Sequence, residues 1–387
     1  MSQRLDLPEF RIEAYFERWE FNARYHLTAS DPESMTVSEL LALGTDADRA
    51  ALDGLWLGYT PTWGTDALRS AIAATYSRVP ADDVLVFTGA EEALFWTLQV
   101  LLGPGEHAVV TVPNYQSTET VPLAAGSSLT GVPLWTGSGS TLDWTLDLDR
   151  VKAALRPNTT VVAVNFPNNP TGYVPSLSTF QELVALCESR GIRLVSDEVY
   201  RGIELDASRT LPQAADLSER AVSINVLSKA YGLPGLRIGW VACCDKAALR
   251  ALERAKEFTT ICNSAPSELL ATVAMRNAPM LRERVRGIVA ANVPVFTDFF
   301  AKHADRFEFT PPDGSCVAFP RYLGPEGVEE FCRRAVEERG LLFLPASIFA
   351  SDLAEVPGDR FRVGLGRLNP QPGLEVLDDF LSTSPPR

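Results

Sequence analysis

The sequence has 387 residues, of which 46% are hydrophobic and 22% are charged, a length and composition suited to two packed globular domains. Its formal net charge of −14 leaves no basic field to attract phosphate backbones or anionic lipids, so nucleic acids and membrane surfaces are not expected partners. Three histidines, and six cysteines without a Cys-x-x-Cys pair, predict no metal site. A small-molecule substrate is the partner that remains.

The beginning of the chain, residues 1–6, contains no apolar stretch. No run of about 18 uncharged apolar residues occurs anywhere in the sequence, and a helix that spans a bilayer needs about that length. We therefore expect neither a signal peptide nor a membrane span, and we expect a cytoplasmic protein. The first 45 residues are helical and polar in places, and we expect them to pack against the C-terminal part of the chain.

Short apolar runs alternate with helical patterns between residues 84 and 245, which is typical of βαβ units. The runs are rich in β-branched residues and show no polar alternation, which favours a parallel sheet that is covered on both faces. Ligands bind at the carboxyl ends of the strands in such sheets. The predicted strands are residues 84–87, 108–112, 161–165, 194–196 and 222–227, with a helix over residues 91–102.

The pattern changes after this region. Residues 247–302 have helical spacing, and the stretch from about residue 305 mixes short strands with helices. A second, smaller α/β domain is the natural interpretation. We predict a large domain over residues 46–285 and a small domain that joins residues 1–45 to residues 286–387.

Polar residues cluster where the predicted strands end. Residues 88–91, Thr-Gly-Ala-Glu, open a helix whose N–H groups would suit a phosphate, although a glycine in such a turn is often there for steric reasons alone. Residues 113–115, Pro-Asn-Tyr, follow the next strand. The segment 165–172 is rich in Asn and Pro, and an ordinary turn is the simpler interpretation of it. Asp197 ends a buried strand, where an acid is more often a helix cap than a catalyst.

Lys229 is harder to explain as a structural residue. It follows the predicted strand 222–227 and precedes a turn rich in Gly and Pro, whereas lysine is seldom buried unless it is paired. Burial would lower the pKa of its amine, as a Schiff-base lysine requires. The position therefore indicates a chemical role.

Three motifs in a fixed order carry a resemblance to a known family. They are Asn-Pro-Thr-Gly at 169–172, Asp-x-x-Tyr at 197–200, and Ser-Lys at 228–229 with Arg237 eight residues after the lysine. Over the span from about Tyr59 to Arg362 the chain resembles the class I/II, fold-type I aminotransferases, which depend on pyridoxal 5′-phosphate (PLP). The resemblance implies an α/β fold, with a mostly parallel seven-stranded sheet between helices in the large domain, a smaller α/β domain, and PLP as the cofactor.

The resemblance also implies a role for each of these polar residues. Lys229 would hold the cofactor as a Schiff base and move the substrate's Cα proton through aldimine and quinonoid intermediates. Asp197 would pair with the pyridine nitrogen and, with Lys229 and Tyr200, form the catalytic set. The other cofactor contacts would be Asn169 and Tyr200 at the 3-oxygen, Tyr115 on the ring face, and Ser228, Arg237 and the turn of Gly89, Ala90 and Glu91 at the phosphate.

Two further segments match the family. Residues 57–64, which end at Gly64, resemble a segment of the family. In that segment a tyrosine, here Tyr59, reaches the phosphate of the neighbouring subunit. The resemblance therefore implies a homodimer with shared active sites. Arg362, in Phe-Arg-Val-Gly-Leu, matches the arginine that binds the substrate α-carboxylate, together with Asn169. The alternative for Arg362 is a surface ion pair worth under about 1 kcal/mol.

The chain departs from the family near the phosphate. Family members often have a hydroxyl three residues before the lysine, but Val226 occupies that place here. One phosphate contact is therefore missing or comes from another group, for which Asn225 and Thr259 are the candidates.

A second departure concerns the segment that covers the substrate. Many members have a Gly-acid-Pro loop, whereas residues 26–34 of this chain read His-Leu-Thr-Ala-Ser-Asp-Pro-Glu-Ser. This segment is similar to that of a subgroup that acts on arginine or hydroxyarginine, which includes capreomycidine synthase and related cyclases. With a cationic substrate, Asp31 or Glu33 would pair with its side chain; solvated loop or cap residues are the alternative.

Three functions follow from this resemblance. We expect transamination between an α-amino acid and a 2-oxo acid. The alternative is another PLP reaction on the same scaffold, such as elimination, cyclisation or lyase chemistry, for example a hydroxyarginine cyclase in specialised metabolism, because fold does not decide reaction type. A non-catalytic ligand-binding protein is the third possibility, and the complete set of Asp197, Lys229 and Arg237 argues against it.

Overall fold

Seven strands form the large sheet in the computed structural model, which describes residues 6–383. Their order across the sheet is β2-β10-β9-β8-β7-β3-β4. Strand β10 is antiparallel to its neighbours β2 and β9, and the other adjacent pairs are parallel, so the predicted mostly parallel seven-stranded sheet is confirmed. The strands are β2 (Val84–Phe87), β3 (His107–Val112), β4 (Ser128–Pro133), β7 (Thr159–Asn165), β8 (Arg193–Asp197), β9 (Val222–Val226) and β10 (Gly239–Cys243).

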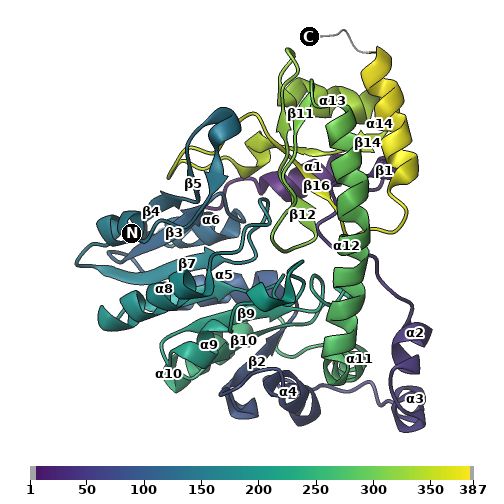
Figure 1. Ribbon diagram of the computed structural model, residues 1–387. Helices are drawn as coiled ribbons and strands as arrows, with labels where there is room; N and C mark the ends of the chain where they lie inside the picture. Colours follow the sequence, from purple (N-terminus) through teal and green to yellow (C-terminus); the bar gives the residue numbers. More distant parts are fainter. Residues whose placement is uncertain (1–5, 384–387) are drawn as a thin grey trace.

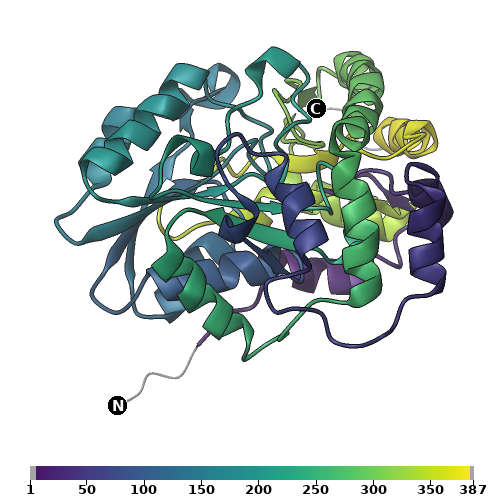
Figure 2. The same ribbon diagram turned by 90° about the horizontal axis from the view of Figure 1, so that it is seen from below.

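Helices cover both faces of this sheet, as the view from below shows (Figure 2). Alternate residues of β7 face opposite sides: Val161 and Ala163 belong to the core that includes α5 and α10, and Val162 and Val164 to the core that includes α8. Both sides are apolar, which explains the lack of polar alternation in the sequence. The helices beside the sheet are α4 (Asp66–Ala73), α5 (Ala90–Leu101), α6 (Ser117–Ala124), α7 (Leu148–Ala154), α8 (Leu177–Ser189), α9 (Ala214–Leu217), α10 (Lys246–Lys256) and α11 (Ala265–Arg276).

Capping residues define where several helices begin. Ser176, Asp245 and Ser264 precede α8, α10 and α11, and each side chain accepts a hydrogen bond from a backbone N–H in the first turn. Thr36 and Thr45 form capping boxes at α2 (Val37–Ala42) and α3 (Asp46–Asp53). These side chains satisfy N–H groups that have no partner inside the helix, so the helix starts are encoded locally.

Helix α12 (Ala278–Lys302) is 25 residues long and extends from beside α11 to the group of smaller sheets (Figure 1). That group has a core rich in phenylalanine, in which Phe307, Phe331 and Phe361 contact one another. No helix in the described part of the chain, α12 included, combines the length and apolar character needed to cross a membrane. The smaller elements are α1 (Arg11–Trp19), β1 (Tyr25–His26), β5 (Trp135–Thr136), β6 (Asp143–Trp144), β11 (Phe307–Glu308), β12 (Val317–Ala318), β13 (Arg321–Tyr322), α13 (Val328–Arg339), β14 (Leu341–Leu342), β15 (Leu344–Pro345), β16 (Phe361–Gly364) and α14 (Gln371–Thr383).

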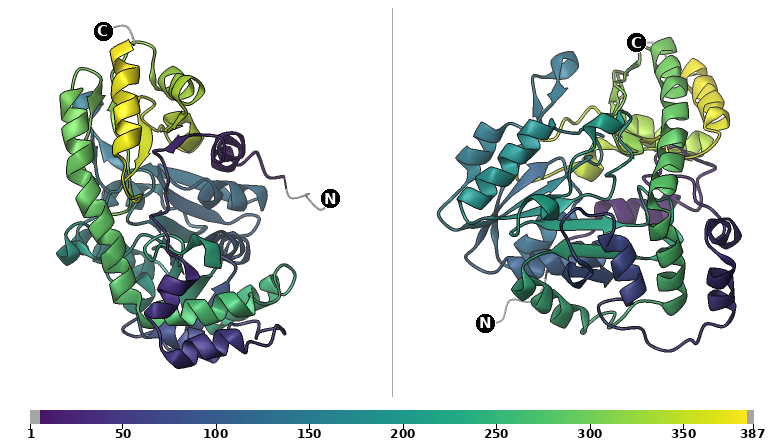
Figure 3. Two further views of the ribbon diagram at one scale, coloured as in Figure 1. Left: turned by 90° about the vertical axis from the view of Figure 1, so that its right-hand side faces the viewer. Right: turned by 60° about the horizontal axis from the view of Figure 1, so that its bottom comes forward.

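The N-terminal segment spans both parts of the molecule (Figure 3). Strand β1 pairs in parallel with β14, so this portion does lie against the C-terminal region. Helices α2 and α3, however, contact α11 beside the large sheet. The division between residues 285 and 286 falls inside α12. The proposed domain bounds, residues 46–285 and residues 1–45 with 286–387, stay a prediction.

Candidate active site

Lys229 lies just beyond the end of β9, where the chain leaves the large sheet. Its side chain is half-buried, and its Nζ donates a hydrogen bond to the Ser30 hydroxyl at 2.9 Å. Burial lowers the pKa of the amine below its ordinary value, although the nearby charge of Asp31 acts in the opposite direction. An amine in this setting is more readily deprotonated and therefore more nucleophilic than a solvated lysine.

Asp197 ends β8 and pairs in the sheet with Asn165 at the end of β7. Within residues 6–383 its carboxylate accepts one hydrogen bond, from the Val199 N–H at 3.2 Å. Burial raises the pKa of this carboxyl to about 6, while the Val199 N–H and the charge of Lys229 lower it. A carboxylate with spare acceptor capacity thus lies within electrostatic reach of Lys229.

Two other predicted residues connect this region to the N-terminal segment and to β16. The buried Tyr200 hydroxyl donates to the Ser30 carbonyl oxygen at 3.0 Å. The Asn169 side-chain oxygen accepts a hydrogen bond from Arg362 Nη1 at 3.1 Å. Residues from four distant stretches of the sequence therefore meet at one place.

Arg362 on β16 is completely buried, at 0% exposure. Its guanidinium donates to neutral acceptors: the Thr28 hydroxyl at 3.4 Å, the Thr28 carbonyl oxygen at 3.0 Å, and Asn169. It forms no ion pair with an acid among the described residues, and burial lowers its pKa. The alternative of a surface ion pair is therefore excluded, and the guanidinium is available to an anion.

The turn after β2 is shaped by two glycines. Gly89 has a φ of 92°, and a Cβ on it would lie 2.6 Å from Arg237 Nη2. A Cβ on Gly239, opposite β2, would lie 2.7 Å from the Ala90 nitrogen. These glycines allow the guanidinium of Arg237, strand β10 and the N-terminus of α5 to approach one another.

Anion-binding groups converge at this turn. The Ser228 hydroxyl is buried and has no hydrogen-bond partner in the described structure. Arg237 is exposed, and its guanidinium donates only to the Pro234 carbonyl oxygen, at 3.3 Å, among the described residues. A phosphate would satisfy both side chains and would also face the positive end of α5.

Tyr115 is partly buried against Phe10, which precedes α1, with ring centroids 5.2 Å apart in an edge-to-face arrangement. The nearby Glu91 accepts a hydrogen bond from the Ser117 hydroxyl, and its buried Oε2 has no hydrogen-bond partner in the part of the chain that the structure describes. Burial raises the pKa of Glu91 to about 7. The Glu91 carboxyl, which has no cationic partner among the described residues, therefore lies near the Tyr115 ring and Asp197.

Comparison with known proteins identifies this arrangement. Residues 26–374 match the family described as aminotransferase class I and II. The chain belongs to this family. Capreomycidine synthase of Streptomyces vinaceus is 30% identical over 380 residues, which is 97% of this chain and 95% of that protein.

Two solved structures extend the likeness to the whole fold of this aminotransferase-family chain. A PLP-dependent aminotransferase from Streptococcus suis superposes with a TM-score of 0.89 at 27% identity and covers 99% of this chain and 100% of its own. The PLP-dependent cyclase OrfR superposes with a TM-score of 0.86 at 29% identity and covers 99% of both chains. The chain has the fold of the fold-type I PLP enzymes, and PLP is its cofactor.

The residues present in this aminotransferase-family site fit that cofactor. The unpartnered Ser228 hydroxyl, the unpaired Arg237 and the glycine-shaped turn suit a phosphate, and Asp197 has acceptor capacity for a protonated ring nitrogen. The individual contacts of these residues to PLP remain predictions. The structure provides hydrogen-bond donors for the phosphate, Ser228 and Arg237, and an acidic acceptor, Asp197, for the ring nitrogen.

Other sequence predictions lie away from this cluster or are already engaged. Tyr59 is 87% exposed, while Gly64, with a φ of 93°, packs closely on Val86. The Asn225 side chain accepts the Val226 N–H at 2.8 Å, and the Thr259 hydroxyl donates to Glu92 at 2.7 Å. Of the two candidate substitutes for the missing hydroxyl at Val226, Thr259 therefore has its hydroxyl engaged, and Asn225 has its side-chain oxygen engaged.

The two acids suggested for a cationic substrate also have partners inside the chain. Asp31 forms an ion pair with Arg367 at 2.7 Å. Glu33 accepts the Leu368 N–H at 3.3 Å. Both acids therefore hold the N-terminal segment against the chain that follows β16, and neither is a helix cap.

Sequence reasoning did not identify Ser30, Thr28 and Cys316 as site residues. Ser30 contacts Lys229 and Tyr200, Thr28 contacts Arg362, and the Cys316 thiol donates to the Ser30 carbonyl oxygen at 3.1 Å. The available signal was the Ser30-Asp31-Pro32 sequence, in which serine stands where the family loop has glycine.

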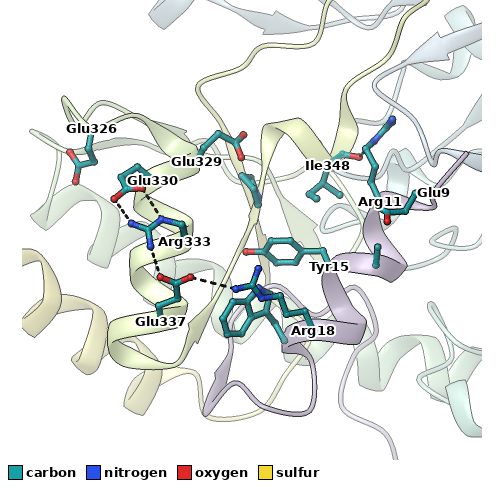
Figure 4. A pocket seen from close by; sticks show the side chains of 13 residues that line it. Glu9, Arg11, Tyr15, Arg18, Glu326, Glu329, Glu330, Arg333, Glu337 and Ile348 are labelled. Carbon is teal, nitrogen blue, oxygen red and sulfur yellow. Dashed lines mark hydrogen bonds and ion pairs between the residues drawn. The ribbon is translucent and has the colours of Figure 1, made fainter.

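A hollow of about 660 Å³ between α1 and α13 contains none of the predicted site residues (Figure 4). Arg333 pairs there with Glu330 at 2.6 Å and with Glu337, and Arg18 approaches Glu337 at 3.7 Å. Arg333 and Arg18 are therefore paired with acids of the same wall, and the Arg18–Glu337 contact joins α1 to α13. The residues predicted for the active site lie elsewhere.

Proposed function

We propose that this enzyme transfers the amino group of an α-amino acid to a 2-oxo acid with PLP. The observation that carries the proposal is Arg362, a buried guanidinium with no acid partner in the described structure, within electrostatic reach of the Lys229 amine. An isolated buried charge costs several kcal/mol, so an anionic ligand is the natural complement. A substrate α-carboxylate at Arg362 would direct the α-amino group toward Lys229.

The cofactor, when bound, draws electrons from the substrate Cα and makes its C–H bond acidic. We assign Asp197 to keep the pyridine nitrogen protonated. Asn169 and Tyr200 are assigned to the 3-oxygen and Tyr115 to the ring face. Ser228, Arg237 and the backbone N–H groups of Gly89, Ala90 and Glu91 are assigned to the phosphate.

Lys229 is assigned two tasks in this proposal. It would hold the cofactor at rest, and its released amine would then take the proton from the substrate Cα and deliver it to the C4′ carbon of the cofactor. A lowered pKa keeps more of the amine in the neutral form that this step requires. Thr28 and Asn169 hold Arg362 in the orientation that places Cα beside the amine.

A second candidate is elimination or cyclisation of a cationic amino acid such as a hydroxyarginine. The similarity to capreomycidine synthase and to the cyclase OrfR favours it, as does the Ser-Asp-Pro sequence at residues 30–32. Since Asp31 and Glu33 already have partners, Glu91 is the better candidate to bind a guanidinium. Its buried Oε2 has no hydrogen-bond partner.

One experiment separates the two reactions. The purified holoenzyme is mixed with single amino acids, arginine and hydroxyarginine among them, without any 2-oxo acid. Conversion of one equivalent of cofactor to the pyridoxamine form supports transamination. Repeated release of ammonia or of a cyclic product, with the cofactor regenerated, contradicts transamination and supports the second candidate.

Glu91→Gln tests which substrate class the site takes. If a guanidinium pairs with Glu91, the variant raises KM for cationic amino acids and leaves KM for uncharged ones unchanged. Glu119→Gln is the matched control, because it makes the same change at another buried carboxyl, which accepts a hydrogen bond from the Ser351 hydroxyl. Equal effects on both substrate classes would contradict the pairing.

We also propose that the enzyme is a homodimer with shared active sites. The supporting observation is an exposed apolar segment, in which Trp56, Leu57 and Tyr59 are 82%, 79% and 87% exposed. Exposed aromatic and aliphatic side chains gathered in one segment are typical of protein interfaces. In the proposed dimer Tyr59 reaches the phosphate of the partner subunit.

A cytoplasmic location is part of the proposal as well. All six cysteines, which lie within the described residues, are free thiols. Free thiols are typical of reducing compartments, where disulfides are rare. Fractionation of the source cells, followed by immunoblotting, tests the location directly.

A further inference from the structure

Ser30 stands where many relatives have the glycine of a Gly-acid-Pro loop, and its side chain has a specific partner. The Lys229 amine donates a hydrogen bond to the Ser30 hydroxyl oxygen at 2.9 Å. A glycine could not make this contact. The two residues are 199 positions apart, so the contact depends on how the N-terminal segment is placed.

The backbone of Ser30 is held at the same point. Its carbonyl oxygen accepts hydrogen bonds from the Tyr200 hydroxyl at 3.0 Å and from the Cys316 thiol at 3.1 Å. A carbonyl oxygen has two lone pairs, and here both have donors. The peptide that carries the hydroxyl is therefore fixed from two other segments of the chain.

Residues 27–34, which we call the strap, are bound to the rest of the site through their backbone. The Gly364 N–H donates to the Leu27 carbonyl oxygen at 2.8 Å, and the Glu33 N–H donates to the Gly366 carbonyl oxygen at 2.7 Å. Arg284 on α12 donates to the carbonyl oxygens of Glu33 and Ser34 at 2.7 and 2.8 Å. These bonds hold the strap at both ends.

A close contact sets the height of the strap above β16. A Cβ on Gly364 would lie 2.3 Å from the Ala29 carbonyl oxygen, so only glycine at residue 364 lets the strap approach this closely. Such preorganisation places a functional group far more accurately than a mobile loop does. The hydroxyl of Ser30 is therefore delivered to Lys229 by a rigid support.

We propose that Ser30 is a positioning residue for the catalytic amine, and that its hydroxyl accepts one N–H of Lys229 so that the lone pair of the amine points toward the substrate Cα. This inference rests on the proposed function, in which Lys229 carries the cofactor and moves the Cα proton. The neutral amine has two N–H groups and one lone pair. When one N–H is held by Ser30, the lone pair has fewer directions available, whereas a glycine would leave the amine free to rotate.

The hydroxyl also affects the basicity of the amine. Around Lys229, the charges of Asp31 and Glu13 and the Cys316 thiol favour the protonated form, and Arg362 opposes it. Ser30 adds a neutral acceptor, which stabilises the ammonium more than the amine. Removal of the hydroxyl alone lowers the pKa of Lys229 and leaves these charged neighbours in place.

The first test uses the protein without cofactor. Acetylation of Lys229 by acetic anhydride is followed at different pH values by mass spectrometry of the peptide that contains it. In Ser30→Ala and Ser30→Gly the pH midpoint falls by about 0.5–1 unit. Ser30→Thr, which keeps the hydroxyl, restores the wild-type midpoint. Ser34→Ala is the control, because the Ser34 side chain makes no hydrogen bond with the described residues and its strap bond comes from the backbone.

The second test uses the holoenzyme and substrate deuterated at Cα. Ser30→Ala and Ser30→Gly lower kcat about tenfold and increase the deuterium isotope effect, while KM stays close to the wild-type value, because the proton step is slowed and the Arg362 contact remains. Ser30→Thr recovers most of kcat. Borohydride reduction labels Lys229 in every variant.

The combined outcomes distinguish the role of Ser30 from the proposed function of Lys229. If Lys229 is labelled but its midpoint and the isotope effect do not change in Ser30→Ala and Ser30→Gly, the role of Ser30 is overturned and the proposed function stands. If wild-type Lys229 is not labelled at all, the proposed function fails, and the inference fails with it.

Discussion

The strap, residues 27–34, and the loop of residues 56–62 are both held firmly, but they present their side chains in opposite directions. The strap faces inward, and its Thr28 and Ser30 contact Arg362 and Lys229. The loop is fixed from behind by the buried Lys256, which donates to the Thr62 carbonyl oxygen at 2.5 Å, yet it exposes Trp56, Leu57 and Tyr59.

This difference indicates how the site is completed. The part of the site that we assign to the substrate carboxylate is assembled within one chain. The exposed loop is apolar and anchored at Thr62, which suits a surface that a second subunit covers.

The largest effect is expected at Arg362, which the strap contacts. Arg362→Met is predicted to lower kcat/KM by about 10²–10³, because loss of a buried charged contact costs about 2–5 kcal/mol. The ligand-free variant should be no less stable to urea than the wild type, since its buried charge is removed. Arg333→Met, which removes a guanidinium on α13 from the hollow that contains no predicted site residue, is the control. An unchanged kcat/KM in Arg362→Met would contradict the assignment of Arg362 to the substrate carboxylate.

Asp197→Asn is predicted to lower kcat by about 10²–10³ through loss of electrostatic stabilisation, and to weaken cofactor binding. In the absence of cofactor, the same substitution should increase the free energy of unfolding. Burial raises the folded pKa of Asp197 from 3.8 to about 6, so the folded state binds this proton more tightly than the unfolded state. The carboxyl therefore destabilises the fold increasingly as pH rises from about 4 to 6, and fully above 6.

Urea unfolding of the cofactor-free protein at several pH values measures this second effect. The variant should be more stable than the wild type by on the order of 1–3 kcal/mol at pH 7 to 8, and the gain should shrink toward pH 4. A gain that is constant with pH would show that the Asp197 carboxyl is not the titrating group.

At the outward side, Leu57→Glu places a charge on the exposed apolar loop. It is predicted to weaken self-association about tenfold or more, because burial of an unpaired charge is unfavourable, and to weaken cofactor binding at low protein concentration. Sedimentation velocity and cofactor titration measure the two effects. Leu177→Glu, at an exposed leucine that begins α8, should have neither. If Leu57→Glu also changes neither self-association nor cofactor affinity, the loop of residues 56–62 is not the interface.

The smallest effect is expected at Val226. Val226→Thr restores the hydroxyl that relatives often have near the phosphate, and it should tighten cofactor binding by about threefold to tenfold, as expected for one added hydrogen bond. Burial of the hydroxyl should lower the stability of the cofactor-free protein by about 1 kcal/mol. Val222→Thr, at the other end of β9, should lower stability without a change in cofactor affinity.

The features that depended on local patterns were predictable from the sequence. Five of the seven strands of the large sheet were visible because both faces of the sheet are buried, whereas β4 and the antiparallel β10 were not predicted. The family motifs located Lys229 and Asp197 near strand ends. The contact of Ser30 with Lys229 could not be predicted, because it depends on the close approach of the strap to Gly364. The pairing of Asp31 with Arg367 was missed for the same reason: side chains far apart in the sequence meet only after the strap is placed.

We assign Lys229 as the amine that holds the cofactor. Borohydride reduction of the PLP-loaded enzyme, followed by digestion and mass spectrometry, identifies the lysine that carries it. We predict that the reduced cofactor is found on the peptide containing Lys229 and is lost in Lys229→Ala. Cofactor trapped on another lysine, such as the buried Lys256, or retained trapping in Lys229→Ala, would contradict the assignment.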